Sequence, residues 1–541
     1  MTVGELIVSY LEERGVRAAF GVVSIHNMPI LDAINRRGNI RFVPARGEAG
    51  ALSMADAYAR VSTGLGVAVT STGTAAGNAS GGMVEALAAG TPLLHLTGQI
   101  DAPYLDRDVG FLHEARDQLG MLKAVSKAAF RILAPEDTLP VLEQAVSAAL
   151  TAPTGPVSIE VPIDVQQAQV KDQTFPPLAV RAVQPQSIEA LAQKLAKAKR
   201  PLLWLGGGAR HAGAAVRRLV DLGFGVVSSV QGRGILPEDH PMTLGAFNIS
   251  PAVEALYATC DALLVVGSRL RSNETLGYRL KLPKPLYRID AAQARAAHPY
   301  AAEVFVTGDS RLALEALLLR LSGLKVDAQF ATDLQSARQA AETQARAALG
   351  PYDVLVDELQ RLAGRDFVWV RDVTISNSTW GNRLLRICGP RDGVHALGGG
   401  IGLGVPMAIG ASIASPDKRV LCLVGDGGLQ LSLGELCTLV QEKSDVVVVL
   451  MNDRGYGVIR NIWDAQYGGR RAYSDLHTPD FAQLAQSIAL PYRAVKSRGE
   501  FQPSLRDAFA QRGPVLVEVD MVAIGPYAAA FAGPPLRKVE A

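Results

Sequence analysis

The chain has 541 residues, of which 48% are hydrophobic and 20% charged, and its formal net charge is +2. This length predicts three or four globular domains, and the near-neutral charge leaves no basic field for nucleic acid. No apolar run reaches transmembrane length, and the N-terminus lacks the charged and apolar stretches of a signal peptide. A cytoplasmic protein that binds neither membrane nor nucleic acid is therefore expected.

Short β-branched apolar runs alternate with helical stretches along the whole chain. Such runs predict buried parallel strands, and helical crossovers between them are what a parallel sheet requires. The fold class predicted is α/β, with three doubly wound parallel-sheet domains. The predicted strands are 67–71, 93–97, 157–161, 202–205, 225–229, 262–266, 367–370, 420–424, 446–450 and 515–519.

Two segments interrupt this alternation and set the predicted domain limits. Residues 166–186 are rich in Gln and Pro and predict an extended linker, whereas 328–349 are rich in Ala and Gln and predict an exposed helix. The division gives an N-terminal domain over 1–170, a central domain over 185–325 and a C-terminal domain over 350–525.

Polar clusters follow two of the predicted strands in the last third. Gly425-Asp426-Gly427 comes directly after one strand, and Asn452-Asp453 after the next. Open α/β sheets bind ligands at the carboxyl ends of their strands, and Mg²⁺ favours one or two carboxylates together with phosphate oxygens. Asp426 and Asp453 are thus predicted metal ligands in a metal–diphosphate anchor; two unrelated turns are the alternative.

This pairing of GDG with a later Asn-Asp resembles the signature of thiamin-diphosphate-dependent enzymes of the acetolactate synthase and benzoylformate decarboxylase type. The resemblance covers essentially the whole chain and implies pyrimidine-binding, central and diphosphate-binding domains, with thiamin diphosphate and Mg²⁺ as cofactors. Asp453 stands where many relatives have Asn, which adds a negative charge beside the diphosphate. The implied third metal ligand is the Gly455 carbonyl. The implied diphosphate-side contacts are Ser376, Gly427, Gly428 and Tyr456.

Two further segments match the resemblance at the aminopyrimidine. Glu48, which alone would suit a first-turn helix acid, matches the family's glutamate that protonates the ring. The loop 397–406 lacks a complete dinucleotide GxGxxG pattern. Within it the Gly399 carbonyl is implied to accept a hydrogen bond from the 4′-amino group, and Ile401 to bend the cofactor. Asn78 is implied to support the pyrimidine.

The substrate side is less determined. Gln99 matches a glutamine that acetolactate synthases place near the reacting carbon, and Phe111 and Lys127 resemble a further region of the same enzymes. The catalytic serine and histidine of benzoylformate decarboxylases are absent. His26 and His113 are therefore the candidate proton shuttles, each with a purely structural role as the alternative.

The implied function is decarboxylation of a 2-oxo acid and transfer of the acyl carbanion to a second carbonyl, as in acetolactate synthase. The alternatives are a non-oxidative 2-oxo acid decarboxylase that releases an aldehyde and, more remotely, an inactive binding or regulatory homologue. FAD in the central domain stays open, because 267–272 keep an arginine-bearing loop without a further flavin signature. The family completes each site between subunits, which implies a homodimer at minimum and, by analogy, a homotetramer.

Overall fold

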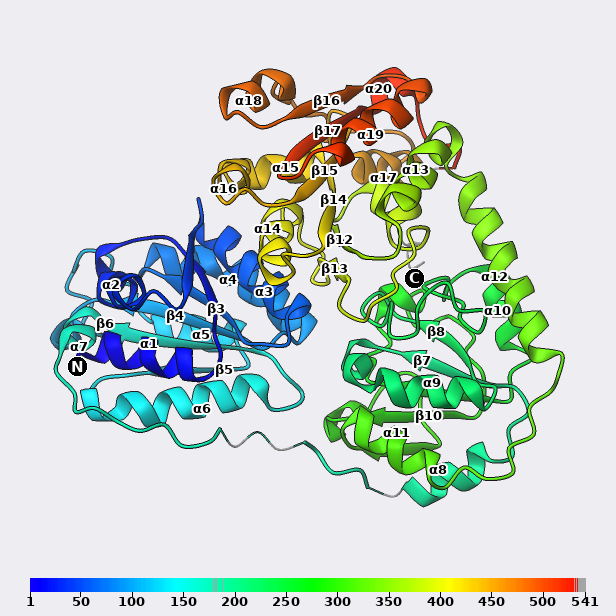
Figure 1. Cartoon of the computed structure of the whole chain (residues 1–541), viewed down its shortest axis with the longest axis horizontal. Coiled ribbons are helices and arrows are strands. Elements are labelled where there is room, and N and C mark those ends of the chain that lie inside the picture. The colour runs from blue at the N-terminus through cyan, green and yellow to red at the C-terminus, as the bar shows by residue number, and fades with distance from the viewer. Residues whose placement is uncertain (179, 181, 187, 530, 532, 534–541) are drawn as a thin grey trace.

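Each of three lobes is built on one sheet, and every strand pairing within those sheets is parallel (Figure 1). The computed structural model describes the chain except residues 179, 181, 187, 530, 532 and 534–541. Residues 179 and 181 belong to the predicted linker and lie outside the described part. The predicted fold class is confirmed.

The N-terminal lobe has a six-stranded sheet in the order β2-β1-β3-β4-β6-β5. Its central strands β3, β4 and β6 are buried along their whole length, as continuous apolar runs predict. The strands are β1 Ala18–Gly21, β2 Arg41–Pro44, β3 Gly66–Thr70, β4 Leu93–Gln99, β5 Ala128–Arg131 and β6 Pro156–Pro162. The helices are α1 Val3–Glu13, α2 Met28–Arg37, α3 Glu48–Val61, α4 Thr74–Ala89, α5 Gln118–Val125, α6 Thr138–Leu150 and α7 Ile163–Gln167.

The central lobe has a five-stranded sheet in the order β11-β10-β9-β7-β8. From β7 the chain first turns to β8 at one edge and then passes β7 again to build β9, β10 and β11 on the other side, so a topological switch point lies between β7 and β9. The strands are β7 Pro201–Leu205, β8 Gly225–Ser228, β9 Ala262–Val266, β10 Leu286–Asp290 and β11 Val304–Thr307. The helices are α8 Ile188–Leu195, α9 Gly213–Asp221, α10 Pro251–Tyr257 and α11 Ser310–Leu318.

The C-terminal lobe has a six-stranded sheet in the order β13-β12-β14-β15-β17-β16. The strands are β12 Phe367–Arg371, β13 Gly393–His395, β14 Arg419–Gly425, β15 Val446–Asn452, β16 Tyr492–Val495 and β17 Val515–Asp520. The helices are α13 Asp353–Ala363, α14 Gly404–Ala414, α15 Asp426–Leu429, α16 Glu435–Gln441, α17 Gly457–Gln466, α18 Phe481–Ser487, α19 Phe501–Ala510 and α20 Met521–Ile524.

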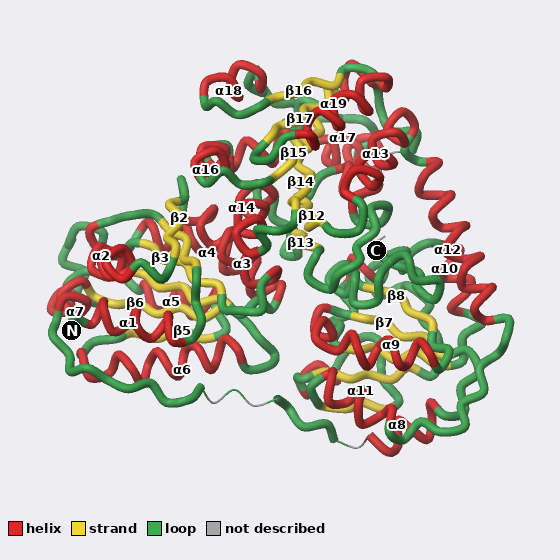
Figure 2. The backbone as a smooth tube through the Cα atoms, viewed as in Figure 1, coloured by secondary structure: helices red, strands yellow, loops and turns green. Residues whose placement is uncertain are grey.

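Two long connections join the lobes. The described residues between α7 and α8 follow one side of the molecule, and α12 (Phe330–Ala347) spans from the central to the C-terminal lobe (Figure 2). The α12 helix buries Phe330, Leu334 and Ala341 on one face, so the helix predicted over 328–349 is present but not exposed all round. Among the described helices, none is long and apolar enough to cross a membrane.

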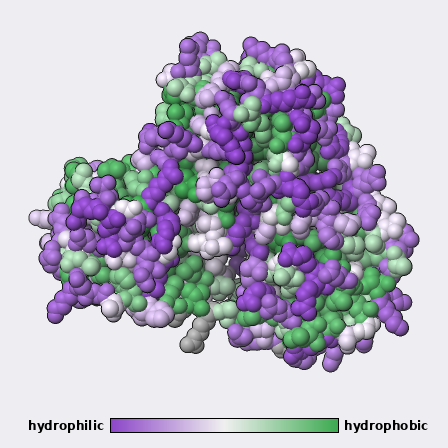
Figure 3. Space-filling model, in the orientation of Figure 1, coloured by the Kyte–Doolittle hydropathy of each residue, from purple (hydrophilic) through white to green (hydrophobic). Residues whose placement is uncertain are grey.

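The N-terminal and C-terminal lobes share one hydrophobic core, where α3 crosses α14. A Cβ on Gly410 would overlap the Met54 carbonyl oxygen, so the absent side chain lets the two helix backbones approach closely. Ala51, Leu52, Met407 and Ala408 are fully buried around this crossing. Hydrophilic residues predominate on the face of the C-terminal lobe in Figure 3, which leaves the apolar packing inside and between the lobes.

Candidate active site

Asp426 and Asp453 lie side by side at the carboxyl end of the C-terminal sheet. Strands β14 and β15 are neighbours, with Gly425 opposite Met451, and each aspartate follows its strand within two residues. The backbone N–H of Asp453 donates to Asp426 Oδ1 at 3.3 Å. Two predicted metal ligands, which are 27 residues apart in sequence, are thus brought together by adjacent parallel strands.

The environment of this pair suits a divalent cation. Burial and the nearby Asp426 charge raise the pKa of Asp453 to about 7, and burial raises the pKa of Asp426. Asp426 Oδ2 is buried and meets no hydrogen-bond donor in the described part of the chain. An adjacent cation would supply the missing partner and favour both carboxylates in their charged form.

The remaining ligands of such a cation would come from backbone and bound ligand. Within the described residues, no three His, Cys, Asp or Glu side chains form a metal-binding group. The Gly455 carbonyl oxygen lies 3.3 Å from where a Cβ on Gly427 would stand, which places it beside the first turn of α15. Two carboxylates, one carbonyl and phosphate oxygens form the donor set that Mg²⁺ prefers, so the residues present fit the metal.

Glycines keep the space around this anchor open. A Cβ on Gly427 would meet the Tyr456 ring at 2.7 Å, and one on Gly428 would lie 3.0 Å from Asp372 Oδ2. Both glycines are in the first turn of α15, where backbone N–H groups without helical acceptors are available to an anion. Ser376, by contrast, is fully buried, and its hydroxyl forms a 2.8 Å hydrogen bond with the Tyr527 hydroxyl.

The glycine loop that precedes α14 is held by two buried acids. Glu85 accepts hydrogen bonds from the N–H groups of Leu397 (2.7 Å) and Gly398 (2.6 Å), and Asp372 accepts from Gly402 N–H at 2.9 Å. Burial raises the pKa of Asp372 to about 6. Between these anchors Gly399 has φ +85 and is exposed, so its carbonyl and the neighbouring Ile401 are accessible to a ligand.

Glu48 is the first residue of α3, and its carboxylate accepts a hydrogen bond from Asn78 on α4 at 3.2 Å. The glycine loop reaches the other end of the same helix, where Arg60 donates to the His395 carbonyl (2.7 Å) and pairs with Glu85 (2.9 Å). Because α3 has 14 residues, these ends are about 20 Å apart. Within one chain, Glu48 and the glycine loop therefore do not face each other.

His26 and His113 come together at the carboxyl ends of β3 and β4, with ring centroids 5.3 Å apart at an interplanar angle of 80°. A Cβ on Gly98 would overlap the His26 carbonyl, and one on Gly73 would overlap the His113 carbonyl, so glycines let both loops approach the strands. Burial and the neighbouring His113 lower the pKa of His26. Its Nδ1 is buried without a partner in the part of the chain described.

Gln99 is part of a buried polar network behind these loops. Its Oε1 accepts from Thr72 at 2.7 Å, and its Nε2 donates to Glu160 at 3.3 Å. Gln118 donates to Glu160 at 2.9 Å and accepts from Gly73 N–H at 2.7 Å. The Gln99 side chain is 2% exposed, so it supports the loop that carries the site and does not itself reach into open space.

Glu85, Asp372 and Glu160 are not predicted from the sequence as site residues, although Asp372 and Glu160 carry a recognisable signal. Glu160 is an acid inside the apolar run that forms β6, and Asp372 directly follows β12. A charged side chain in a buried strand needs partners, which marks it as a candidate for a network. The helical spacing of Glu85 gives no such sign.

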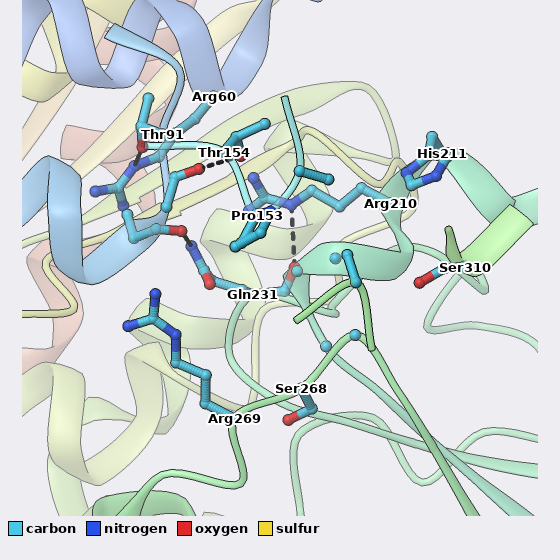
Figure 4. A pocket seen from close by; sticks show the side chains of 18 of the residues that line it. Arg60, Thr91, Pro153, Thr154, Arg210, His211, Gln231, Ser268, Arg269 and Ser310 are labelled. Atoms are coloured by element: carbon cyan, nitrogen blue, oxygen red, sulfur yellow. Dashed lines mark hydrogen bonds between the residues drawn. The ribbon is translucent and has the colours of Figure 1, made fainter. Parts of the chain in front are cut away.

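A cavity of about 290 Å³ opens between the N-terminal and central lobes, at the switch point between β7 and β9 (Figure 4). The Gly206–Gly208 turn follows β7, and a Cβ on Gly206 would overlap the loop after β9. A second cavity of about 650 Å³ shares Arg269, Arg271 and Arg295 with the first and extends to Gly398 and Gly399. The two spaces therefore form a path from the switch point to the glycine loop.

Two arginines enter this cavity without a carboxylate partner among the described residues. Arg210 donates only to the Gln231 carbonyl, at 3.1 Å, and Arg269 extends from the loop after β9 (Figure 4). Burial together with Arg60 and Arg391 lowers the pKa of Arg210 to about 9, and burial together with Arg295 and Arg271 lowers that of Arg269 to about 10. The cavity thus has an excess of positive charge.

Comparison with known proteins matches all three lobes. Models of the thiamine pyrophosphate enzyme N-terminal TPP-binding, central and C-terminal TPP-binding domains match residues 1–121, 188–317 and 374–519. A probable 2-ketoarginine decarboxylase of Pseudomonas aeruginosa is 32% identical over 96% of this chain and 94% of its own length.

Acetolactate synthases are similar over a comparable length. The probable large subunit of Methanocaldococcus jannaschii is 28% identical over 95% of this chain and 91% of its own length. Isozyme 3 of Escherichia coli is 28% identical over 96% and 94%, respectively. Since the three domain models follow the order of the three lobes and the relatives align almost end to end, this chain belongs to the thiamine pyrophosphate enzyme family.

Proposed function

We propose that the protein decarboxylates a 2-oxo acid with thiamin diphosphate and Mg²⁺. The observation that carries this proposal is the adjacent Asp426–Asp453 pair beside the Gly455 carbonyl, a donor set that fits a diphosphate-bound Mg²⁺. Thiamin diphosphate, when bound, supplies a carbon nucleophile and the electron sink for loss of CO₂. The protein must supply position, proton transfer and exclusion of water.

Distinct residues would perform these tasks. Asp426, Asp453 and the Gly455 carbonyl would hold the metal, while Gly427, Gly428 and Tyr456 would border the diphosphate. The fully buried Ser376 would act through its bond to Tyr527 and support this wall from behind.

On the pyrimidine side, Gly399 would orient the ring through its carbonyl and Ile401 would fix its bend. Glu48, oriented by Asn78, would exchange a proton with the ring nitrogen, which is general acid–base catalysis by a placed carboxyl group. Because Glu48 and the glycine loop of one chain lie at opposite ends of α3, we infer that each site combines Glu48 of one copy with the metal anchor of a second. A homodimer is then the minimum assembly, and a homotetramer remains the prediction from the resemblance.

The predicted fate of the decarboxylated intermediate is carboligation, which is the transfer of the acyl carbanion to a second carbonyl. The relatives named acetolactate synthase are named for a reaction of this kind. Two observations favour simple decarboxylation as the second candidate. Gln99 is engaged in a buried network, and Lys127 Nζ donates to the Ala148 (2.6 Å) and Thr151 (2.8 Å) carbonyls. One relative is moreover named a probable 2-ketoarginine decarboxylase.

The test measures CO₂ release and products from pyruvate, benzoylformate and 2-ketoarginine, with thiamin diphosphate and Mg²⁺ present. Acetohydroxy acids or acyloins support carboligation, whereas aldehyde alone supports the decarboxylase. We expect Glu48→Gln to lower turnover by about 100-fold or more while cofactor binding persists. Glu13→Gln, at an exposed acid on α1, is the matched control. Binding without turnover of any 2-oxo acid would support the inactive homologue instead.

We further propose that the cavity at the switch point takes the diphosphate of a nucleotide, with FAD as the candidate. Glycine-rich turns at a switch point bind such groups. Arg210 and Arg269, which pair with no carboxylate among the described residues, supply the positive charge (Figure 4). FAD would give visible absorbance in the purified protein, and ADP in equilibrium dialysis would reveal a site for the nucleotide part alone. Arg210→Met should weaken whichever binds, with Arg217→Met on α9 as the control.

A further inference from the structure

Arg460, in the first turn of α17, reaches the predicted metal ligand Asp453 with its side chain. Its Nη2 donates to the Asp453 carbonyl at 2.9 Å and lies 4.0 Å from Asp453 Oδ1. Its Nε lies 3.0 Å from Asp475. Side chains of helical residues point back toward the helix N-terminus, which is why the fourth residue of α17 reaches the loop that precedes it.

The same guanidinium fixes the position of Gly455. A Cβ on Gly455 would overlap both Arg460 Nη2 and the Ser474 carbonyl, so the glycine backbone lies directly under the arginine. The loop is fastened from the other side as well, because Tyr456 N–H donates to the Ser474 carbonyl at 2.8 Å and Gly455 forms an isolated bridge with Asp475. Arg460 therefore touches the segment that carries two of the three predicted metal ligands.

Charge explains why an arginine belongs at this position. Asp426 and Asp453 together bring two negative charges to a place that must also accept an anionic diphosphate. Arg460 is only 18% exposed and Asp453 19%, so solvent screens their interaction incompletely. Asp426, Asp453 and Arg460 sum to −1, the charge that one aspartate and one asparagine would have without the arginine. Asp475 also pairs with Arg460, but its side chain is 83% exposed, so solvent screens its charge far more than that of Asp453.

We propose that Arg460 is a positioning residue that offsets the charge of Asp453 and holds the Gly455 carbonyl in place for the metal–diphosphate group. This inference rests on the proposed function, since it assigns a role at the same anchor. It goes beyond that function by coupling two residues: the aspartate at position 453 requires the arginine at 460.

In the experiment, protein freed of thiamin diphosphate is titrated with this cofactor at saturating Mg²⁺. Isothermal calorimetry measures the dissociation constant. Loss of a residue that orients a metal ligand typically costs 10- to 100-fold in affinity. We therefore expect Arg460→Met to raise the dissociation constant at least about tenfold. In the D453N background, where the charge to be offset is gone, the same change should raise it by less than about threefold, a non-additivity that a double-mutant cycle detects.

Two variants serve as controls. Arg460→Lys keeps the charge but loses the planar guanidinium that reaches both the Asp453 carbonyl and Asp475, so it should raise the dissociation constant less than Arg460→Met does. Arg471→Met removes an arginine that lines the same surface pocket as Asp453 and Arg460 but pairs with Asp464, and it should leave the dissociation constant unchanged. Thermal melting of the metal-free variants reports whether each one is folded.

Equal effects of Arg460→Met in both backgrounds would overturn the coupling, as would an equal effect of Arg471→Met. In either case the parent protein still binds thiamin diphosphate, so the proposed function stands. A parent protein that fails to bind thiamin diphosphate with Mg²⁺ would overturn both the inference and the proposed function.

Discussion

His26 and His113 have different surroundings, although the sequence predicts both equally as candidate proton shuttles. His26 is 7% exposed with an unpartnered Nδ1 among the described atoms, whereas His113 is exposed on its loop. Burial and His113 hold the pKa of His26 below its ordinary value, so His26 is neutral at pH 7 and able to accept a proton. His26 is thus the better candidate for the proton shuttle.

We predict that His26→Asn lowers turnover by about 100-fold and that His113→Asn has a clearly smaller effect. In the parent protein, activity that requires neutral His26 should fall as the pH drops below about 6.5 through the lowered pKa of this residue. The profile of kcat/KM against pH checks this.

The His26→Asn variant should lose that acidic decline, while the His113→Asn variant should keep it. A parent profile that stays flat down to pH 5 would count against His26 as the titrating group. An unchanged decline in the His26→Asn variant would do the same.

At this scale the sequence predicts residue types better than residue roles. Asp426 and Asp453 could be paired from sequence because each follows a recognisable buried strand. Gln99, Lys127 and Ser376 could not be assigned in the same way, because their side chains bond to Glu160, to the Ala148 and Thr151 carbonyls, and to Tyr527. Those partners are set by tertiary packing, which a one-dimensional pattern does not contain.

Among the structural elements, strands with a continuous apolar run are predictable from sequence and strands without one are not. The predicted run 446–450 lies inside β15 (Val446–Asn452), and 262–266 is identical to β9. Edge strands such as β2, with the exposed Arg41, and β16 lack a continuous apolar run. β10 pairs on both sides and is buried, yet it contains Arg288 and Asp290. These polar residues interrupt the apolar run, so the sequence does not predict this strand.

Gly410 allows the close crossing of α3 and α14. α3 begins at the candidate residue Glu48, and α14 begins directly after the glycine loop. We predict that Gly410→Ala lowers stability by about 1–3 kcal/mol, because the added methyl group must displace the α3 backbone at Met54. The strain should also move the start of α14 relative to its glycine loop. The thermal midpoint and the affinity for thiamin diphosphate check the two effects.

The control is Gly499→Ala, where a Cβ would meet nothing within 4 Å. It should leave both measured quantities close to those of the parent protein. Equal midpoints for the two variants would show that the crossing tolerates the added methyl group.

On the scale of the whole molecule, a buried neutral histidine makes stability depend on pH. His95 is fully buried, its ring bonded to Thr70 at 2.8 Å and Ser158 at 3.2 Å, and burial lowers its pKa to about 4. In the unfolded chain the imidazole of His95 takes up a proton near pH 6.5, whereas in the folded chain it does so only near pH 4. The free energy of unfolding therefore has its full value above pH 6.5 and decreases as the pH falls toward 4.

We predict a loss of about 2 kcal/mol between pH 7 and pH 5 from His95 alone. The decrease in thermal midpoint over this interval should be smaller in a His95→Gln variant than in the parent protein. The same decrease in both proteins would show that other groups govern the acid limb of stability.

The proposed assembly is inferred from the position of Glu48 and the glycine loop at opposite ends of α3. If each site joins Glu48 of one copy to Asp426 of another, a chain with Glu48→Gln and a chain with Asp426→Asn are each inactive alone. In a mixed dimer, both lesions fall in one site, and the other site combines an intact Glu48 with an intact Asp426. Random pairing of equal amounts then restores about one quarter of the parent activity.

We predict that activity returns when the two variants are coexpressed and the mixed dimer is purified through a different affinity tag on each variant. The tags select the mixed dimer, in which half of the sites are intact, so activity per site should approach about half of the parent value. Coexpression of Glu48→Gln with Glu48→Ala is the control, because every site then lacks the glutamate and no activity should return. A site built within one chain would contain a lesion in every copy, and an inactive mixed dimer would therefore refute the assembly that the length of α3 implies.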